Sequence, residues 1–231
     1  TTDAEGNPRP RRGNPLVEIA DSIRYVKAEP KLRRLVVVSF FVIMFGFNYV
    51  AFLPSLVMDT FGQTETFVGL AMMAAAIGAV ATAIPTAKLA DGPRAQGLMD
   101  AAGYLFGAAV LALAFAPNFL VAFGVLMVVG GATAMFQSLS NTLALTRATD
   151  AVQGRVQSLL MLSFAGFGIA AGPLGVLAEV LGRRQAIAVM GVVVLISMAI
   201  YRVFEQRGAR NGETITSTVA VAAPEPVSVG G

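Results

Sequence analysis

The sequence contains no histidine, cysteine or tryptophan, and only 13% of its residues are charged. These absences exclude thiol nucleophiles, imidazole bases, thiolate or imidazole metal sites, and disulfides. Carboxylates, lysine, serine and tyrosine remain, but few of them lie in the apolar stretches. We therefore expect a protein that is not an enzyme and that carries neither a metal nor a cofactor.

The chain is instead rich in apolar residues, which make up 55% of its 231 positions and give a mean hydropathy of +0.69. A soluble protein normally has about twice this share of charged residues. The net charge of +3 comes from basic residues that lie between the apolar stretches rather than on one soluble face. Membrane topology explains them better than nucleic-acid binding, so we expect membrane lipid, and no nucleic acid, as a partner.

Six apolar stretches are long enough to cross about 30 Å of hydrocarbon as helices. Hydrocarbon excludes open strands, because their backbone groups would stay unpaired. The sequence therefore predicts an all-α, polytopic membrane protein with six transmembrane helices. The predicted spans are residues 35–57, 67–87, 98–116, 119–143, 156–178 and 186–204.

The basic residues predict how these spans run. If both termini are cytoplasmic, every Lys and Arg except Arg183 and Arg184 falls on the cytoplasmic side, as the positive-inside rule favours. We therefore expect a multi-pass protein of the cell membrane with both termini in the cytoplasm. The expected divisions are a polar linker (1–15), a cytoplasmic amphipathic helix at the membrane interface or packed on the protein (16–34), the six-helix transmembrane domain (35–204) and a disordered cytoplasmic tail (205–231).

Polar side chains inside the spans are candidates for a binding cavity, because an amide in lipid is costly unless it meets a partner or water. In the fourth span Gln137 and Asn141 lie one helical turn apart on a polar stripe. In the first span Asn48 shares a helical face with Phe45 and other phenylalanines. We expect these four residues to line a cavity for a small organic molecule. The alternative for each is an interhelical hydrogen bond or ordinary aromatic packing.

Asp100 is the only acidic residue within the predicted spans. It is a possible proton site if desolvation favours its neutral form. Its place near the inner end of the third span also fits an interfacial carboxylate with access to water. Two pairs, Gly130–Gly131 and Gly172–Pro173, predict helix bending, although such pairs also occur in rigid helices.

Three segments carry a resemblance to the major facilitator superfamily. Leu89-Ala90-Asp91 followed by Arg94 resembles the family's cytoplasmic motif G-x-L-A-D-R-x-G-R-R. Residues 150–158 (DAVQGRVQS) with the glycines that follow them, and residues 17–25 (VEIADSIRY), resemble the drug and siderophore exporter branch, which includes enterobactin exporters and macrolide efflux proteins.

The resemblance implies a secondary transporter that exports a small organic molecule by alternating access, driven by protons. The family has twelve spans, so this chain would be one six-helix half. The linker-like start and a fourth span without Arg favour the carboxy-terminal half. The missing amino-terminal half, or a second copy, is then an expected partner. Asp91, Arg94 and Arg155 would make cytoplasmic gating contacts. The alternative is a non-transporting six-helix module for protein interaction or assembly.

Overall fold

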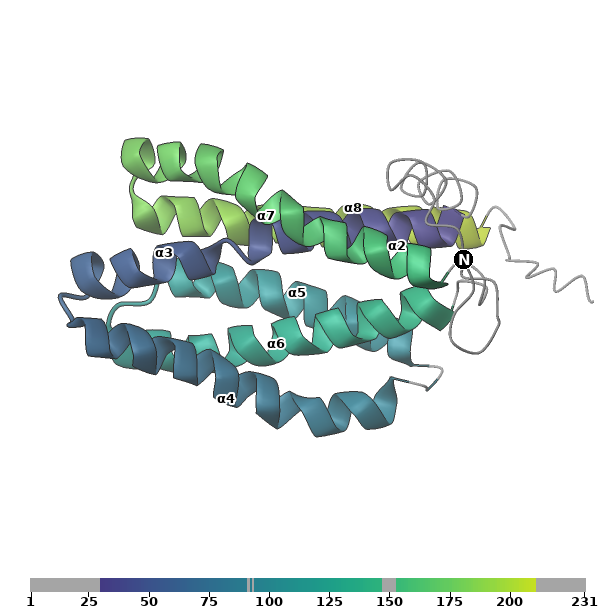
Figure 1. Cartoon of the computed structure of the whole chain (residues 1–231), viewed down its shortest axis with the longest axis horizontal. Coiled ribbons are helices and arrows are strands. Elements are labelled where there is room, and N and C mark those ends of the chain that lie inside the picture. The colour runs from purple at the N-terminus through teal and green to yellow at the C-terminus, as the bar shows by residue number, and fades with distance from the viewer. Residues whose placement is uncertain (1–29, 91, 93, 147–152, 211–231) are drawn as a thin grey trace, which may run out of the picture.

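The structure, a computed structural model, describes residues 30–90, 92, 94–146 and 153–210. In these ranges the chain is helical, without strands, and the helices pack as a bundle (Figure 1). The elements are α2 (Pro30–Phe41), the π-helical turn η1 (Val42–Gly46), α3 (Tyr49–Ser55), the π-helical turn η2 (Leu56–Thr60), α4 (Glu65–Leu89), α5 (Ala95–Ala114), α6 (Phe119–Thr146), α7 (Gln153–Leu181) and α8 (Arg183–Arg210).

The all-helical membrane fold is confirmed. Five helical stretches of the described chain are long and apolar enough to cross a membrane: Leu32–Thr60, Glu65–Leu89, Ala95–Ala114, Phe119–Thr146 and Arg183–Arg207. They correspond to the first four predicted spans and the sixth. The fifth predicted span lies in α7, whose described apolar stretch, Phe167–Leu181, is shorter. The sixth crossing therefore stays a prediction.

The predicted segments on either side of the transmembrane domain, residues 16–34 and 205–231, can be compared with the structure only in part. The amphipathic helix predicted over residues 16–34 falls mostly outside the described residues, and its last part belongs to α2, which begins at Pro30. At the other end α8 continues to Arg210, past residue 204, where the tail was expected to begin. An ion pair between Glu205 and Arg34, 3.8 Å apart, holds this last part of α8 beside α2.

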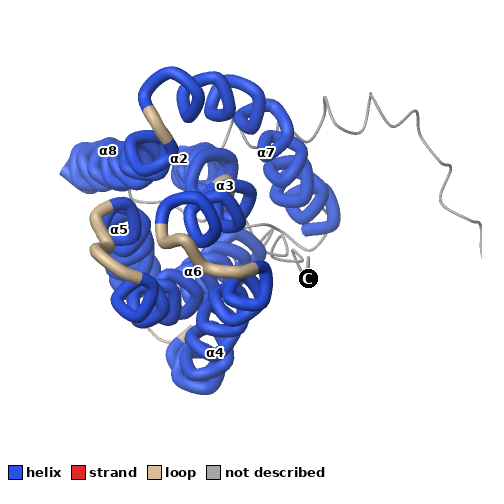
Figure 2. Tube along the Cα trace, turned by 90° about the vertical axis from the view of Figure 1, so that its left-hand side faces the viewer, coloured by secondary structure: helices blue, strands red, loops and turns tan. Residues whose placement is uncertain are grey.

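The helices of the bundle are joined by close contacts at small residues. α4 packs mainly on α6, where Gly78 of α4 meets the backbone of Met127, and Gly130 of α6 meets Ala75. α5 packs against both α6 and α8. Viewed along the bundle, α4 lies at its outer edge and α7 at the opposite corner (Figure 2). Much of α4 faces outward, as a helix in contact with lipid does.

Tight turns at two glycines bring successive helices into antiparallel pairs. Gly62 (φ 64°) precedes α4, and Gly182 (φ 99°) joins α7 to α8. Such positive φ angles favour glycine, which has no Cβ to clash with the backbone. The Gly182 N–H closes α7 by bonding the Ala178 carbonyl at 3.0 Å. As a result, α2 begins and α8 ends at the same end of the bundle (Figure 1).

Candidate functional site

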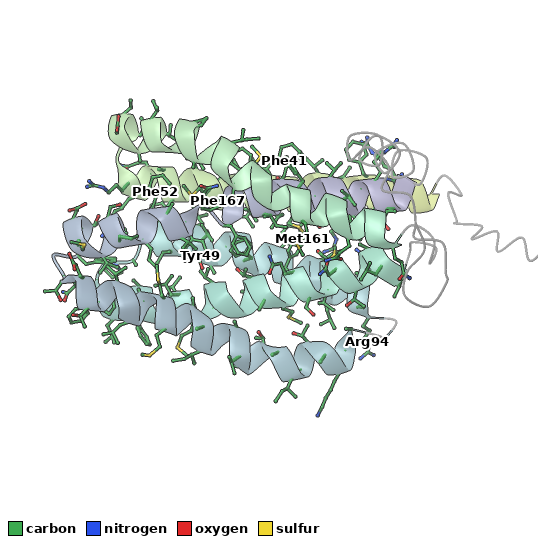
Figure 3. All side chains as sticks on the ribbon, viewed as in Figure 1. Phe41, Tyr49, Phe52, Arg94, Met161 and Phe167 are labelled. Atoms are coloured by element: carbon green, nitrogen blue, oxygen red, sulfur yellow. The ribbon has the colours of Figure 1, made fainter. Side chains whose placement is uncertain are left out.

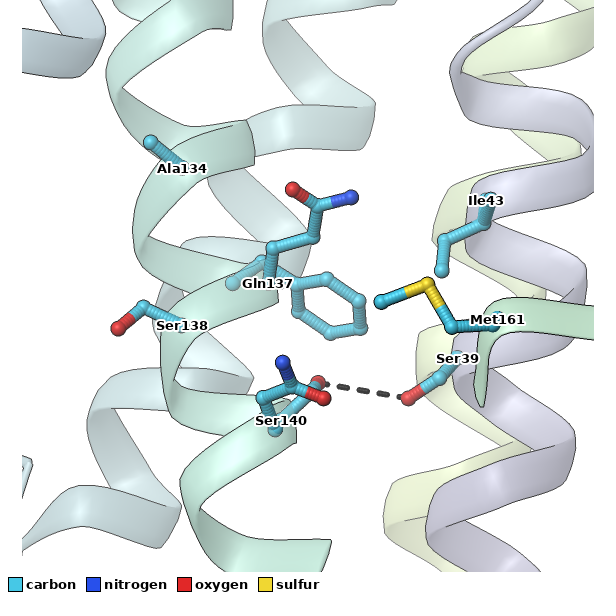
Figure 4. A pocket seen from close by; sticks show the side chains of 9 residues that line it. Ser39, Ile43, Ala134, Gln137, Ser138, Ser140 and Met161 are labelled. Atoms are coloured by element: carbon cyan, nitrogen blue, oxygen red, sulfur yellow. Dashed lines mark hydrogen bonds between the residues drawn. The ribbon is translucent and has the colours of Figure 1, made fainter. Parts of the chain in front are cut away.

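The first membrane-spanning stretch, Leu32–Thr60, runs from α2 through η1 and α3 to η2, and we call it the first helix. A cavity of about 350 Å³ lies between the first helix, α6 and α7. The first helix contributes from α2 and η1, α6 contributes most of the wall, and α7 contributes a methionine (Figure 4). The lining residues are Ser39, Ile43, Ala134, Phe136, Gln137, Ser138, Ser140, Asn141 and Met161. The cavity lies in the half of the bundle where α2 begins.

Two of the four residues predicted to line a cavity, Gln137 and Asn141, do lie in this wall. They fall one turn apart on α6 because that helix is regular over its whole length. Ser140 beside them accepts a hydrogen bond from the Ser39 hydroxyl, at 3.4 Å, which links α6 to the first helix across the cavity floor (Figure 4).

The described part of the lining is polar but uncharged. Amide and hydroxyl groups supply hydrogen-bond donors and acceptors, while Ile43, Phe136 and Met161 supply apolar surface. Among the lining residues that the structure describes there is no Lys, Arg, Asp or Glu. Such a wall binds organic molecules through shape, apolar contact and a few directed hydrogen bonds.

Asn48 occupies a different place from the one predicted. It is fully buried and does not line the cavity. Its Nδ2 donates to the Met44 carbonyl and, at 3.3 Å, to the Phe167 carbonyl of α7. Its Oδ1 has no hydrogen-bond partner among the described residues. Asn48 thus connects the first helix to α7.

Phe45 also lies outside the cavity lining. Its ring stacks on Phe41, with centroids 6.3 Å apart and planes within 1°. Phe41 itself is 41% exposed on another face of the first helix. Phe41 and Phe45 therefore share a face that is not the cavity face. The π-helical turn η1 lies before Asn48 and changes the phase of the helix, so Asn48 leaves the face on which a regular period places it with these two rings.

The predicted cytoplasmic gating residues are only partly described. Asp91 lies outside the described residues, and Arg155 belongs to α7 but its side chain is not described. Arg94 is exposed and directly precedes α5, at the end of the bundle where α2 begins (Figure 3). A gating contact among the three residues therefore stays a prediction.

Asp100, the predicted proton site, lies away from the cavity. Gln96 donates through Nε2 to Asp100 Oδ1 at 3.3 Å and to the Tyr201 hydroxyl of α8 at 2.8 Å. Tyr201 is buried, and Asp100 is partly exposed. These side chains join α5 to α8 near the end of the bundle where α2 begins. Protonation of Asp100 stays a prediction.

The residues predicted to bend helices occur in uninterrupted helices. α6 runs through Gly130 and Gly131, where its backbone comes close to α4. α7 runs through Gly172 and Pro173, and a Cβ built on Gly172 would meet no atom within 4 Å. Bending at these positions stays a prediction.

Three features of the site were not predicted from the sequence. Ser39 and Met161 line the cavity, and a hydroxyl within the first span was the available signal for Ser39. The irregular turns η1 and η2 were also missed, and for η2 there was a partial signal in Pro54, because proline removes one helical hydrogen bond. In the described part of the chain, no three His, Cys, Asp or Glu side chains gather as a metal site would require.

Comparison with known proteins places these features in a family. Residues 8–227 match the transmembrane secretion effector family. The staphyloferrin A transporter of Staphylococcus aureus is 25% identical over 189 residues, which cover 81% of this chain and 46% of the relative. The chain thus spans less than half the length of that protein. No solved structure matches the sequence.

The match covers nearly the whole chain, and its family and the relative are transporters. The prediction that the chain is not an enzyme is therefore confirmed, as is the expected resemblance at the level of the superfamily. Five long apolar helices and the family together identify a multi-pass membrane protein. The chain belongs to the transmembrane secretion effector family of the major facilitator superfamily.

Proposed function

We propose that this chain is the carboxy-terminal six-helix half of an efflux transporter, and that its cavity forms one wall of the path for a small organic molecule. The observation that carries the proposal is the uncharged, hydrogen-bonding lining between the first helix, α6 and α7. The relative that transports staphyloferrin A supports an organic cargo of this kind. Because the chain covers 46% of that relative, the opposite wall would belong to a second half.

An exposed face of α7 supports the presence of such a partner half. Among the described residues, Cβ atoms built on Gly168, Gly172 and Gly175 meet nothing within 4 Å, and Ile169 and Val176 on the same helix are more than 60% exposed. Small residues let a neighbouring helix approach closely. We propose that a helix of the missing amino-terminal half, or of a second copy, packs here.

The proposed mechanism is alternating access, in which the two halves rock about the cavity. Described cations support an orientation with both termini cytoplasmic: Arg33, Arg34, Lys88, Arg94, Arg202 and Arg207 lie toward one end of the bundle, and Arg183 and Arg184 lie at the other. Asp91, Arg94 and Arg155 are the proposed cytoplasmic gate. Asp100 is the proposed proton-responsive group, and its link to Tyr201 would carry its effect to α8.

The test is transport by the whole protein in inverted membrane vesicles, with staphyloferrin A as the first cargo and a panel of neutral amphipathic drugs as further cargoes. The double variant Gln137→Ala and Asn141→Ala should lower flux about thirtyfold, because each amide contributes about 1 kcal/mol as a hydrogen-bonding group and about 1.4 kcal/mol is a factor of ten. Gln206→Ala is the matched control, since this amide is exposed near the end of α8.

The result distinguishes the two functions that remain open. Unchanged flux in the double variant, with normal membrane insertion, would refute the cavity assignment. A wild-type protein that moves none of these cargoes would favour the alternative of a six-helix module for interaction or assembly.

A further inference from the structure

A second recess, of about 390 Å³, lies on another side of the first helix, between α2 and α8. It is separate from the cavity, which uses other side chains of α2. Its lining residues are Arg33, Arg34, Val37, Val38, Phe41, Ser197, Ile200, Tyr201 and Phe204. We call it the α2–α8 groove.

One end of the groove is cationic. Arg33 and Arg34 lie there, in the first turn and a half of α2. Glu205 is the one described acid beside them, 3.8 Å from Arg34. Two more cations, Arg202 and Arg207, are exposed on the same stretch of α8. A guanidinium has five N–H donors in a planar fork, so it can bind a carboxylate and a phosphate together.

The rest of the groove is apolar and exposed. Val37, Phe41 and Ile200 are 48%, 41% and 51% exposed. From Arg34 to Phe41 the helix rises roughly 10 Å. This is about two thirds of the roughly 15 Å of hydrocarbon in one leaflet of a membrane. The two hydroxyls of the lining already have protein partners: Ser197 donates to the Val193 carbonyl at 2.7 Å, and Tyr201 bonds Gln96 at 2.8 Å.

We propose that the α2–α8 groove binds an anionic phospholipid, with the phosphate at Arg33 and Arg34 and one acyl chain along Val37, Phe41 and Ile200. The order of the lining, cationic at the helix end and apolar below it, matches the order of headgroup and chain in a lipid. Basic pockets between transmembrane helices recognise anionic headgroups in this way. The apolar wall favours a lipid over free phosphate, because phosphate alone has no apolar group to contact Val37, Phe41 and Ile200.

The proposal does not depend on transport, because it requires only that the chain lies in a membrane. Native mass spectrometry of the whole protein measures it directly. Protein released from mixed micelles of phosphatidylglycerol and phosphatidylcholine should retain phosphatidylglycerol preferentially. Arg33→Gln with Arg34→Gln should reduce that preference at least about fivefold, whereas Arg202→Gln with Arg207→Gln, which removes the same charge outside the groove, should leave it nearly unchanged.

Equal losses in the two double variants would overturn the proposal, because the effect would then be one of net charge. The single variant Arg33→Gln, which leaves the Arg34–Glu205 pair intact, covers the case in which the double variant fails to fold. Inorganic phosphate serves as a competitor. At about 10 mM it should not displace the lipid, because free phosphate in salt solution binds surface arginines only weakly. Displacement by phosphate would show an anion site rather than a lipid site.

Photolabelling locates the acyl chain. Phosphatidylglycerol with a photoreactive acyl group should label Phe41 and Ile200 more strongly than Val80 and Ile84, which are 72% and 68% exposed on the outer face of α4. Equal labelling of the two surfaces would mean ordinary bulk lipid and would overturn the proposal. Absence of label in the groove would mean that another segment of the protein covers it, and would overturn the proposal as well.

Discussion

The substitution Gly78→Ala is expected to force α4 away from α6, because the two backbones touch at this glycine. A Cβ built on Gly78 overlaps the Met127 carbonyl oxygen and lies 2.7 Å from the carbonyl carbon. Ordinary van der Waals contact begins at 3.4 Å. The carbonyl is backbone and cannot rotate aside, so the helices must separate by at least about 0.7 Å.

The cost of that separation follows from the contacts that it weakens. A gap of 0.5–1 Å forfeits roughly a quarter to a half of the dispersion energy of each contact that it opens, and α6 is the main neighbour of α4. The Thr82 hydroxyl would also lose its contact with the Gly131 carbonyl, now 3.1 Å. Such an interhelical bond contributes about 0.6 kcal/mol on average. We expect a total destabilisation of about 2–3 kcal/mol.

The assay is thermal unfolding of the purified protein in a mild detergent. The fraction that stays folded after heating is measured by size-exclusion chromatography. Gly124→Ala is the matched control, because it lies on α6 and a Cβ there meets nothing within 4 Å. It should be neutral or slightly stabilising, since alanine favours a helix over glycine by up to about 1 kcal/mol. Gly78→Ala should lower the midpoint by about 5 °C or more. Equal midpoints for the two variants would refute the close contact between α4 and α6.

Three further contacts can be tested by substitution. Asn48→Leu should change stability by less than about 1 kcal/mol, since the lost bond to α7 is offset by removal of a buried, unpaired carbonyl; a loss as large as that of Asn48→Asp would contradict this balance. Gln96→Leu and Tyr201→Phe should each cost about 1 kcal/mol, and a double-mutant cycle should show that the two losses are not additive. The Asp59–Arg183 pair, at 3.0 Å and with both side chains 48% exposed, should contribute about 0.5 kcal/mol or less after solvent screening, so a coupling well above that in a double-mutant cycle would contradict its exposed position.

The parts of the fold that were predictable from the sequence are those set by simple lengths and periods. A span must have about 20 apolar residues, so five helices could be located within a few residues of their observed positions. Gln137 and Asn141 were placed on one wall because α6 is a regular helix, in which residues four apart share a face. The same rule was applied to the first helix, where the helix is not regular.

The first helix has irregular turns that a regular helical period of 3.6 residues does not predict. The turns η1 and η2 are π-helical, and the Phe61 N–H bonds the Leu56 carbonyl five residues back, at 3.2 Å. Pro54 precedes η2 and has no N–H to bond within its own helix. η1 has no proline, and it ends at Gly46, where the Phe106 ring of α5 packs so closely that there is no room for a side chain. That contact involves residues 60 positions apart, which no local pattern encodes.

The two recesses give the first helix an additional role, because it borders both. Ser39 and Ile43 face the cavity, while Val37 and Phe41 face the α2–α8 groove. A movement of this helix that opens one recess must alter the other, since the interior is packed and cannot absorb the shift locally. By thermodynamic linkage, a lipid that prefers one position of the helix changes the affinity of the cavity for its cargo, and the cargo changes the affinity for the lipid by the same factor. If both proposals hold, cargo binding should strengthen in membranes that contain phosphatidylglycerol or weaken in them, and Arg33→Gln should reduce this dependence on lipid without changing any residue of the cavity.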